Sequence, residues 1–508
     1  MASTSRIAKN TIALYFRQIL IMLVSLYTVR VVLNTIGAED YGIYNVVAGV
    51  VTMFGFLSGA MATASQRFFS FEMGKENNEN LSKIFSVTLT IYAVIAVLII
   101  VLAETAGLWF VNTRLVVPVQ RLTAARWIYQ CAVLSFLFTI LTTPYMSLII
   151  AHENMNVYAY VSIVEALLKL AVVFVLKIGK LDKLILYGIL LLCVAVINTS
   201  LYRFYCRKHY AECKFRFVYD KEKFKEIFGF TGWTLFGQFT TIIRNQAVTI
   251  LINQFFTPVV VAARSIAQQV TNAVSVFSAN FNTSLYPPII KEYSAGNKEE
   301  MFRLVNNGSK MTFFLMWIFT LPLVFHLDFV LSLWLKNVPE WTVLFTRLSL
   351  IEVLINSLSF PLQTAARAPG KMRTYELTLG IMQLFIFAFS FVFFNIGFAV
   401  WTTFVVSSAI TVLMMIARLV IVKKQTGFSV RNFIVQVVFP LTAVCTISGV
   451  VVAVMFMFFP KTILSSVLQI LFCVAETMAC MYFIGMNKNQ KKKTVDMVRQ
   501  FFNKKRDR

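Results

Sequence analysis

The stretch SVTLTIYAVIAVLIIVLAETAGL, residues 86–108, decides the fold class. Its only charged residue is Glu104, and its length matches the roughly 20 apolar residues that cross the hydrocarbon core of a bilayer. Similar blocks fill the chain, so that 58% of its 508 residues are hydrophobic and only 14% are charged, against about a quarter in soluble domains. No stretch between the blocks is long enough for a soluble domain. The sequence therefore predicts an all-α, polytopic membrane protein.

We predict fourteen transmembrane helices from these blocks. The first six are Thr11–Leu33, Asn45–Ala64, Ser86–Leu108, Trp127–Ile149, Tyr158–Leu176 and Leu184–Phe204. The next six are Gly229–Gln254, Val259–Tyr286, Met311–Leu331, Trp341–Ala365, Tyr375–Phe394 and Phe398–Val420. Two more follow, Phe433–Phe459 and Thr462–Gly485.

The formal net charge of +24 would suggest a nucleic-acid partner in a soluble protein. Here Lys and Arg gather in the connections of one side, as in the basic segment around residues 203–225, and positive-inside bias explains this without nucleic acid. We therefore expect both termini to be cytoplasmic, in a bacterial inner membrane. The apolar run after Met1–Asn10 has no small-residue cleavage site, so we interpret it as the first span.

A weak internal repeat relates the two halves of the chain. Phe16-Arg17-Gln18 parallels Phe236-Gly237-Gln238, and the loop at 72–77 parallels the loop at 294–299, with offsets of about 220 residues. Parallel repeats of this kind place a substrate path between two lobes. We predict a six-helix lobe at 1–210, a basic linker at 211–228, a second six-helix lobe at 229–425, an extra helix pair at 426–485 and a basic cytoplasmic tail at 486–508.

Polar residues recur every three or four positions in several spans, which places them on one helix face. The eighth span carries Arg264, Gln268, Thr271, Ser275, Ser278 and Asn282. The seventh carries Thr234, Gln238, Thr241, Asn245 and Thr249, with Arg244 beside that line. The tenth carries Glu352, Asn356, Ser359 and Gln363, with a kink expected at Pro361, and the first carries Asn10, Arg17 and Thr28 on one face.

Hydroxyl and amide side chains often only join helices to one another, and this is the plain interpretation of most of these residues. It is weaker for Arg17, Arg244 and Arg264, because charge at membrane depth needs a cavity or a partner. We therefore predict a water-filled, cation-lined path that binds an anionic guest through these arginines together with Asn245, Gln268 and Asn282. Glu165 and Lys169, spaced four apart, are expected to form an internal pair.

Two carboxylates are candidates for coupling transport to H⁺ or Na⁺. Glu352 is the first and Glu476 the second, because both are acids inside predicted spans. A structural hydrogen bond to a neighbouring helix is the alternative for each.

The segment Ile36-Gly37-Ala38-Glu39-Asp40-Tyr41-Gly42-Ile43-Tyr44 and the run Ser65-Gln66-Arg67-Phe68-Phe69 resemble signatures of polysaccharide transporters. With fourteen spans in a 6+6+2 plan, the chain resembles the O-antigen and capsule flippases of the multidrug/oligosaccharidyl-lipid/polysaccharide exporter superfamily. The resemblance implies two lobes in a V that alternate between inward- and outward-open states. It also implies a polyprenyl-diphosphate-linked oligosaccharide as the guest, functional arginines in the first and eighth spans (here Arg17 and Arg264), and a lipid-tail groove at the last helix pair.

Other classes of function are less well supported by the residues. An ion-coupled multidrug or metabolite antiporter of the same superfamily would favour cationic guests, which the arginines oppose. A membrane-embedded polysaccharide polymerase or ligase usually has a large external loop, whereas the longest external connection, Trp109–Arg126, is short. No Walker A motif occurs, and Cys206, His209 and Cys213 lack the fourth ligand of a zinc site, so we expect no cofactor, metal or enzymatic activity.

The end of the chain, from Lys491 to Arg508, is basic, with Val498, Phe501 and Phe502 interleaved. We predict that it lies on anionic lipid of the inner leaflet. A disordered, solubilising tail is the alternative.

Overall fold

The computed structural model describes residues 2–52, 54–113, 118–178, 182–213, 220–335, 337–458, 462–488 and 490–492. Within these ranges the regular elements are helices, so the predicted all-α fold is confirmed. Ten helical segments of this part of the chain are long and apolar enough to cross a membrane, which makes the protein a polytopic membrane protein. Each of the fourteen predicted spans overlaps at least one observed helix.

The chain divides into two compact units. The N-unit comprises Ile7–Gln238 with Tyr293–Ala295, and the C-unit comprises Phe239–Glu292, the described residues from Gly296 onward and the N-terminal residues up to Arg6. The boundary falls inside a single helix, α9 (Lys221–Phe255), which begins within the predicted linker at 211–228. The helices of 426–485 belong to the C-unit.

In the N-unit, two of the predicted spans differ from single continuous α-helices. The predicted second span is two helices that end and begin at Thr52 and Gly55, and the third continues from α4 into α5 through a π-helical turn, η1. The helices of this unit, besides the first part of α9, are α1 (Ala2–Ile36), α2 (Ala38–Thr52), α3 (Gly55–Gly74), α4 (Asn78–Leu102), η1 (Ala103–Gly107), α5 (Leu108–Thr113), α6 (Leu122–Ala151), α7 (Met155–Ile178) and α8 (Lys183–His209).

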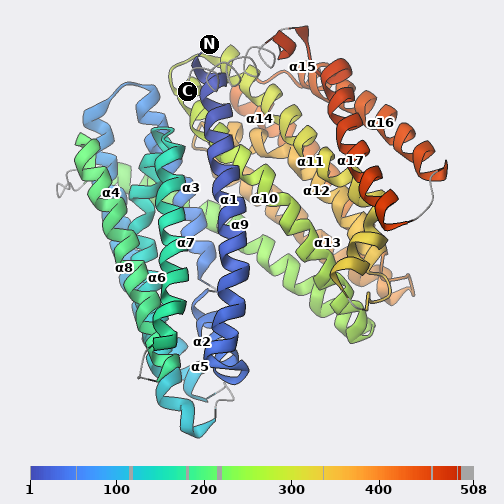
Figure 1. The fold of residues 1–508 in the computed structure, drawn as a ribbon. Coiled ribbons are helices and arrows are strands. Elements are labelled where there is room, and N and C mark those ends of the chain that lie inside the picture. The colour runs from blue at the N-terminus through green and yellow to red at the C-terminus, as the bar shows by residue number, and fades with distance from the viewer. Residues whose placement is uncertain are drawn as a thin grey trace, which may run out of the picture. The chain divides into compact units, whose positions relative to one another are not determined.

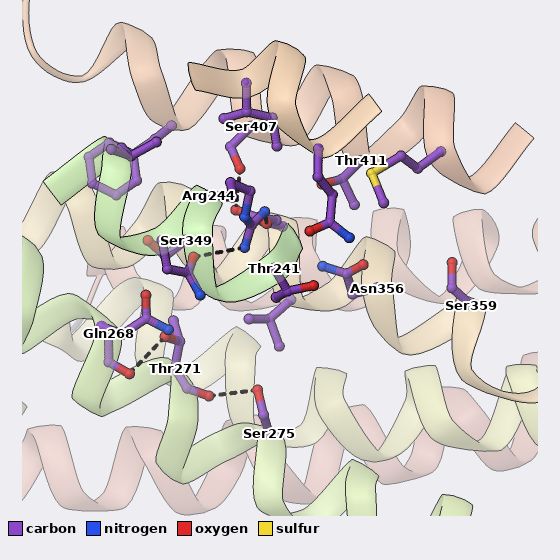
Figure 2. Close-up of a pocket in the computed structure, with 18 of the residues that line it drawn as sticks. Thr241, Arg244, Gln268, Thr271, Ser275, Ser349, Asn356, Ser359, Ser407 and Thr411 are labelled. Carbon is purple, nitrogen blue, oxygen red and sulfur yellow. Dashed lines mark hydrogen bonds and ion pairs between the residues drawn. The ribbon is translucent and has the colours of Figure 1, made fainter. Parts of the chain in front are cut away.

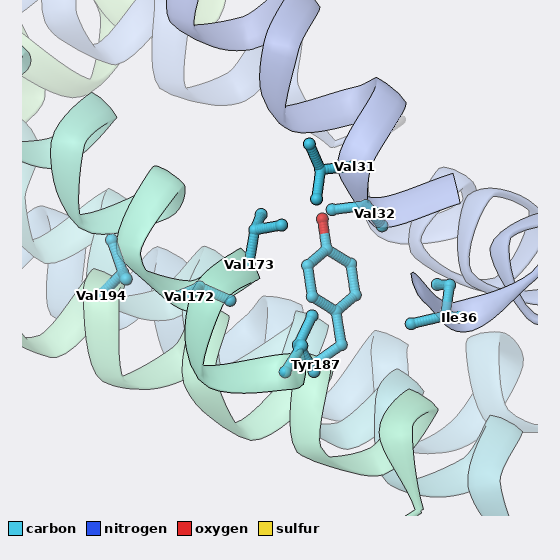
Figure 3. Packing of buried hydrophobic residues seen from close by; sticks show 8 residues of the cluster. Val31, Val32, Ile36, Val172, Val173, Tyr187 and Val194 are labelled. Atoms are coloured by element: carbon cyan, nitrogen blue, oxygen red, sulfur yellow. The ribbon is translucent and has the colours of Figure 1, made fainter. Parts of the chain in front are cut away.

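The end of α1 packs on α7 and α8 through branched aliphatic side chains around Tyr187 (Figure 3). α1 stops at Gly37, whose φ of +88° is a conformation that favours glycine. The chain then turns into α2, where Tyr44 meets Tyr187 edge to face at 4.9 Å and Asp40 accepts a hydrogen bond from Arg121 at 2.8 Å. Several residues of the 36–44 signature therefore help to pack α2 against other parts of the N-unit.

The C-unit is built around α12, which packs against α11 and α14, while α17 packs on α11 (Figure 1). α12 runs unbroken through Pro361, and a non-helical residue occurs instead in α11, at His326. The helices are α10 (Pro258–Ser294), α11 (Lys298–Trp334), α12 (Thr342–Arg367), α13 (Met372–Asn395), α14 (Thr402–Thr426), α15 (Val430–Phe433), the π-helical η4 (Ile434–Val438), α16 (Phe439–Phe458), α17 (Ile463–Cys480) and the π-helical η5 (Met481–Gly485).

The repeat is visible in the turns that end α3 and α10. In both turns an asparagine N–H, from Asn77 or Asn297, donates to the carbonyl five residues earlier, at 3.2 Å and 2.9 Å. The residue before it has a positive φ, 55° at Glu76 and 83° at Gly296, as in a Schellman turn. Asn77 and Asn297 are 220 residues apart, the same offset as between Phe16 and Phe236. The alignment of the two loops predicted from sequence is therefore wrong by two residues.

The C-terminal helices attach to α11 by close packing and by polar contacts at one end. Lys310 is almost fully buried and donates from Nζ to the Gly485 carbonyl and to Gln490 Oε1, both at 3.0 Å. A Cβ added at Gly485 would lie 2.3 Å from Phe314 Cζ and 3.2 Å from Val444 Cγ2. Small residues allow helices to approach closely in lipid, where apolar burial does not drive association. The predicted tail beyond 492 lies outside the described residues.

We expect Gly485→Ala to lower the thermal stability of the purified protein, by about 1–3 kcal/mol, because the added methyl group overpacks this contact. Gly449→Ala is the matched control: it lies on α16 of the same helix pair and its Cβ would meet no atom within 4 Å. Thermal unfolding in detergent measures both. Equal melting temperatures for Gly485→Ala and wild type would contradict this packing.

Candidate functional site

The C-unit contains a polar cavity of about 460 Å³, lined by α9, α10, α12, α13 and α14. The predicted polar faces of the seventh, eighth and tenth spans meet here, so three stripes that are separate in sequence share one space. Figure 2 shows the side chains that converge on it, among them Thr241, Arg244, Gln268, Thr271, Ser275, Ser349, Asn356, Ser359, Ser407 and Thr411.

An ion pair and a hydrogen bond to its carboxylate join three of the helices that line the cavity. Arg244 on α9 donates from Nη1 to Glu352 Oε1 on α12 at 3.0 Å, and both side chains are less than a fifth exposed. Ser407 on α14 donates to the other carboxylate oxygen of Glu352 at 2.7 Å, and Arg244 Nη2 donates to Asn245 Oδ1 at 3.0 Å. The charges of Arg244 and Glu352 therefore offset each other within the cavity wall.

Two further arginines line the cavity, and neither has a carboxylate oxygen within ion-pair distance in the described part of the chain. Arg264 on α10 donates from Nε to Thr249 Oγ1 at 3.3 Å, and its guanidinium carbon lies 5.8 Å from the Phe404 ring centroid. Arg418 on α14 donates from Nε to the Tyr375 hydroxyl at 2.7 Å. With three arginines and one glutamate in its lining, the cavity carries a formal charge of +2.

Some polar atoms at this cavity are buried without a hydrogen-bond partner in the described part of the chain. They are Arg244 Nε, Ser359 Oγ and Gln383 Oε1. Buried polar atoms in native proteins are nearly always satisfied by protein, water or ligand. The arrangement suits a hydrated or polar guest with negative charge.

The structure brings together five of the predicted site residues: Arg244, Asn245, Arg264, Gln268 and Glu352 all line this cavity. Asn282 lies about two turns beyond Ser275 on α10 and is not among the residues that line the cavity. Its Nδ2 donates to the Ser278 carbonyl at 2.7 Å and its Oδ1 accepts from Thr312 at 3.5 Å.

The other two predicted residues lie elsewhere. Glu476 is on α17, away from the lining, and accepts a hydrogen bond from the Cys480 thiol at 2.9 Å. Arg17 belongs to the N-unit, where its guanidinium lies 4.5 Å from the Tyr158 ring centroid and donates to Ser162 Oγ at 3.4 Å. A cation–π contact of this kind offsets part of the cost of charge at membrane depth.

Arg418 is the charged lining residue that the sequence interpretation missed. The signal was present, because Thr403, Ser407, Thr411 and Arg418 recur at helical spacing along the twelfth predicted span and all four line the cavity. The overall apolarity of that span concealed the stripe.

Comparisons with known proteins agree on the class of protein. Residues 7–293 match the family model of polysaccharide biosynthesis proteins, and residues 234–401 match the MatE family model. No protein of curated function shows a significant sequence match.

Solved structures with the same fold include transporters of the MOP superfamily. An outward-facing multidrug resistance MATE family transporter of the MOP superfamily aligns with a TM-score of 0.71 at 12% identity, over 83% of this chain and 95% of that one. A MOP superfamily transporter from Pyrococcus furiosus, described as having a binding pocket of reverse polarity that suggests a different function, aligns with a TM-score of 0.68 at 12% identity, over 82% and 96%. At this identity the likeness concerns the fold alone.

We expect Glu352→Gln to destabilise the protein by about 1–3 kcal/mol, because it leaves Arg244 in the cavity wall without its counter-charge. The double variant Arg244→Gln/Glu352→Gln removes both charges and should recover part of that loss, which a double-mutant cycle in thermal unfolding measures.

The exposed pair Arg303–Glu300 of α11, at 2.7 Å, provides the control, and Glu300→Gln should change stability little. Additive effects of the two cavity substitutions would show that the pair contributes no coupling energy and would contradict this account.

Proposed function

Because the chain belongs to the polysaccharide biosynthesis protein family, whose model covers more than half of its length, we propose that it is a lipid-linked oligosaccharide flippase. It moves a polyprenyl-diphosphate-linked oligosaccharide from the cytoplasmic to the periplasmic leaflet of a bacterial inner membrane, for assembly of O-antigen or capsule. The family matches and the candidate membrane spans support a multi-pass membrane transporter of the MOP superfamily.

The net positive cavity of the C-unit is the observation that carries this proposal. A diphosphate brings negative charge, and the planar guanidinium fork of arginine suits phosphate oxygens. Arg264 is the leading ligand, because its contacts in the described chain are a hydroxyl partner and an aromatic neighbour, and no carboxylate lies within ion-pair distance of it. The polyprenyl tail can stay in hydrocarbon, so only the head group needs a polar route.

Directional transport also needs two states that differ in ligand or ion affinity. Glu352 is the proposed coupling group, because protonation of its carboxylate would release Arg244 from the ion pair and raise the cationic charge available to the guest. Glu476 remains the second candidate and lies outside the cavity lining. Binding of H⁺ is favoured over Na⁺, since Glu352 is the one acidic residue in the lining and its oxygens already have protein partners.

A multidrug antiporter is the second candidate function, because one solved structure with the same fold is described as a multidrug resistance transporter. A cationic drug would meet a formal charge of +2 in the C-unit cavity. Repulsion in a low-dielectric site is strong, so the cavity favours the anionic guest.

The test is a translocation assay in liposomes with a fluorescent polyprenyl-diphosphate oligosaccharide, in which leaflet exposure is followed by quenching. We expect Arg264→Gln to reduce the rate about tenfold or more, as loss of a charge-assisted hydrogen bond would. Arg264→Lys should fall between, because it keeps the charge and loses the fork.

Arg303→Gln is the matched control, since Arg303 lies on α11 of the same unit and is 65% exposed. All variants are compared at equal folded yield. If wild type moves no such lipid but exports a small cationic dye, the flippase proposal is wrong and the antiporter takes its place.

A further inference from the structure

The C-unit cavity extends along the length of α14. Its lining follows one face of that helix from Thr403 to Arg418, and residues between 349 and 363 of α12 line it as well. At 1.5 Å per residue each of these stretches is about 20 Å long. Figure 2 shows part of the row, with Ser407 and Thr411 following one another along α14. The two ends of the cavity are therefore far enough apart to act as different sites.

Arg264 lies at one end of this cavity. Its guanidinium carbon is 5.8 Å from the ring centroid of Phe404, which belongs to the first turn of α14. The Arg244–Glu352 ion pair lies near the same level, because Ser407, the third residue after Phe404, donates to Glu352. Glu352 offsets Arg244, so this end of the lining carries a net formal charge of +1.

Arg418 lies at the other end of the cavity. It follows Phe404 by 14 residues on the same helix, which corresponds to about 21 Å along the axis. Helical side chains all lean toward the start of their helix, so the guanidinium groups of Arg264 and Arg418 are much further apart than the two phosphates of a diphosphate. The lining residues of α12 and α14 between the two ends are uncharged. One diphosphate can therefore contact only one of these arginines at a time.

The outer nitrogen atoms of Arg418 are available to a ligand. Its Nε donates to the hydroxyl of the buried Tyr375 at 2.7 Å. Its Nη1 and Nη2 have no hydrogen-bond partner in the described part of the chain and are not fully buried. Tyr375 thus fixes the inner side of the guanidinium and leaves its outer side for the cavity.

Two charged residues outside the lining surround this end of the cavity. Glu376 on α13 interacts electrostatically with both Arg418 and Arg367 of α12. Their formal charges are opposite, and neither Glu376 nor Arg367 lines the cavity. The end at Arg418 therefore also keeps a net formal charge of +1.

A second cavity, of about 540 Å³, lies within the N-unit and differs in charge. Its lining contains one acid and one base, Glu165 and Lys169. Lys169 Nζ lies 2.6 Å from Glu165 Oε1, so the predicted internal pair is confirmed. This cavity is formally neutral and offers an anion no net attraction, in contrast to both ends of the C-unit cavity.

We propose that the C-unit cavity contains two separate anion-binding positions, one at Arg264 and one at Arg418, and that the diphosphate head group of the guest occupies them in turn. Tyr375 is the positioning residue of the second position, because its hydroxyl holds Nε while Nη1 and Nη2 face phosphate oxygens. The inference rests on the proposed function and deepens it, since it gives the head group a route with two stations.

The order of the two positions follows from the ends of α14. Lys423 and Lys424 lie in its last turn, and positive-inside bias places such residues on the cytoplasmic side. Arg418 is therefore nearer the leaflet from which the guest starts. A charged group at membrane depth needs a counter-charge or water, so a second arginine shortens the distance that the diphosphate crosses without one.

The experiment is a calorimetric titration of the purified full-length protein with inorganic diphosphate, which is small enough to fill both positions at once. Wild type should bind two diphosphate ions. Arg418→Gln and Arg264→Gln should each remove one, and the double variant should remove both. Tyr375→Phe should keep two but weaken, about fivefold to tenfold, the one that Arg418→Gln removes, as loss of one hydrogen bond would.

Arg303→Gln is the matched control and should keep both ions, because Arg303 lies on α11 and is 65% exposed. Tyr375→Phe keeps the test open if Arg418→Gln fails to fold. A single bound ion that only Arg264→Gln removes, or two ions that neither Arg418→Gln nor Tyr375→Phe affects, would overturn the inference and leave the flippase proposal standing. Failure of wild type to bind any diphosphate would instead contradict the proposed function itself.

Discussion

The contact between Arg244 and Glu352, extended by Ser407, joins α9, α12 and α14 around one space. The hydrocarbon core offers no water to polar groups, so charge there must be satisfied by protein or by a hydrated cavity. Because Glu352 uses both of its carboxylate oxygens within the protein, it holds three helices at a distance that leaves a cavity between them. The same pairing removes one positive charge from the lining, so that the remaining charge of the cavity lies with Arg264 and Arg418.

The positions of the helices within each unit are set by turns and packing contacts inside that unit. Schellman turns at Asn77 and Asn297 return the chain sharply, and α11 then serves as the support for both α12 and the C-terminal helices. Gly485 allows the last helices to approach α11 closely, and Lys310 of α11 donates hydrogen bonds to the Gly485 carbonyl and to Gln490. A cavity lined by five helices therefore depends on turns and contacts that lie outside it.

Periodicity along a single helix was enough to predict much of this structure. Apolar blocks predicted the helices, and the three- or four-residue spacing of Arg264 and Gln268 predicted a common face that indeed lines the cavity. What periodicity could not predict is which face of which helix meets another, since that is decided by tertiary packing. For this reason the sequence predicts Glu352 as a coupling carboxylate, with a hydrogen bond to a neighbouring helix as the alternative, and does not identify Arg244 as its partner.

The same limit explains the errors at the edges of the site. Asn282 lies on the same face of α10 as Arg264 but beyond the residues that line the cavity. There its Oδ1 accepts a hydrogen bond from Thr312 of α11. Arg418 was hidden by the apolar residues around it, although it ends a polar stripe on α14. The break between α2 and α3 was also missed, because hydropathy alone cannot distinguish one continuous span from two consecutive helices.

The charge of the C-unit cavity is proposed to select an anionic guest. This is tested by the equilibrium affinity of purified wild-type protein for a polyprenyl diphosphate and for a lipophilic cation of similar size, at low and at high salt. We expect the diphosphate to bind more tightly and its advantage to shrink as salt screens the charges. Tighter binding of the cation, at either salt concentration, would contradict it.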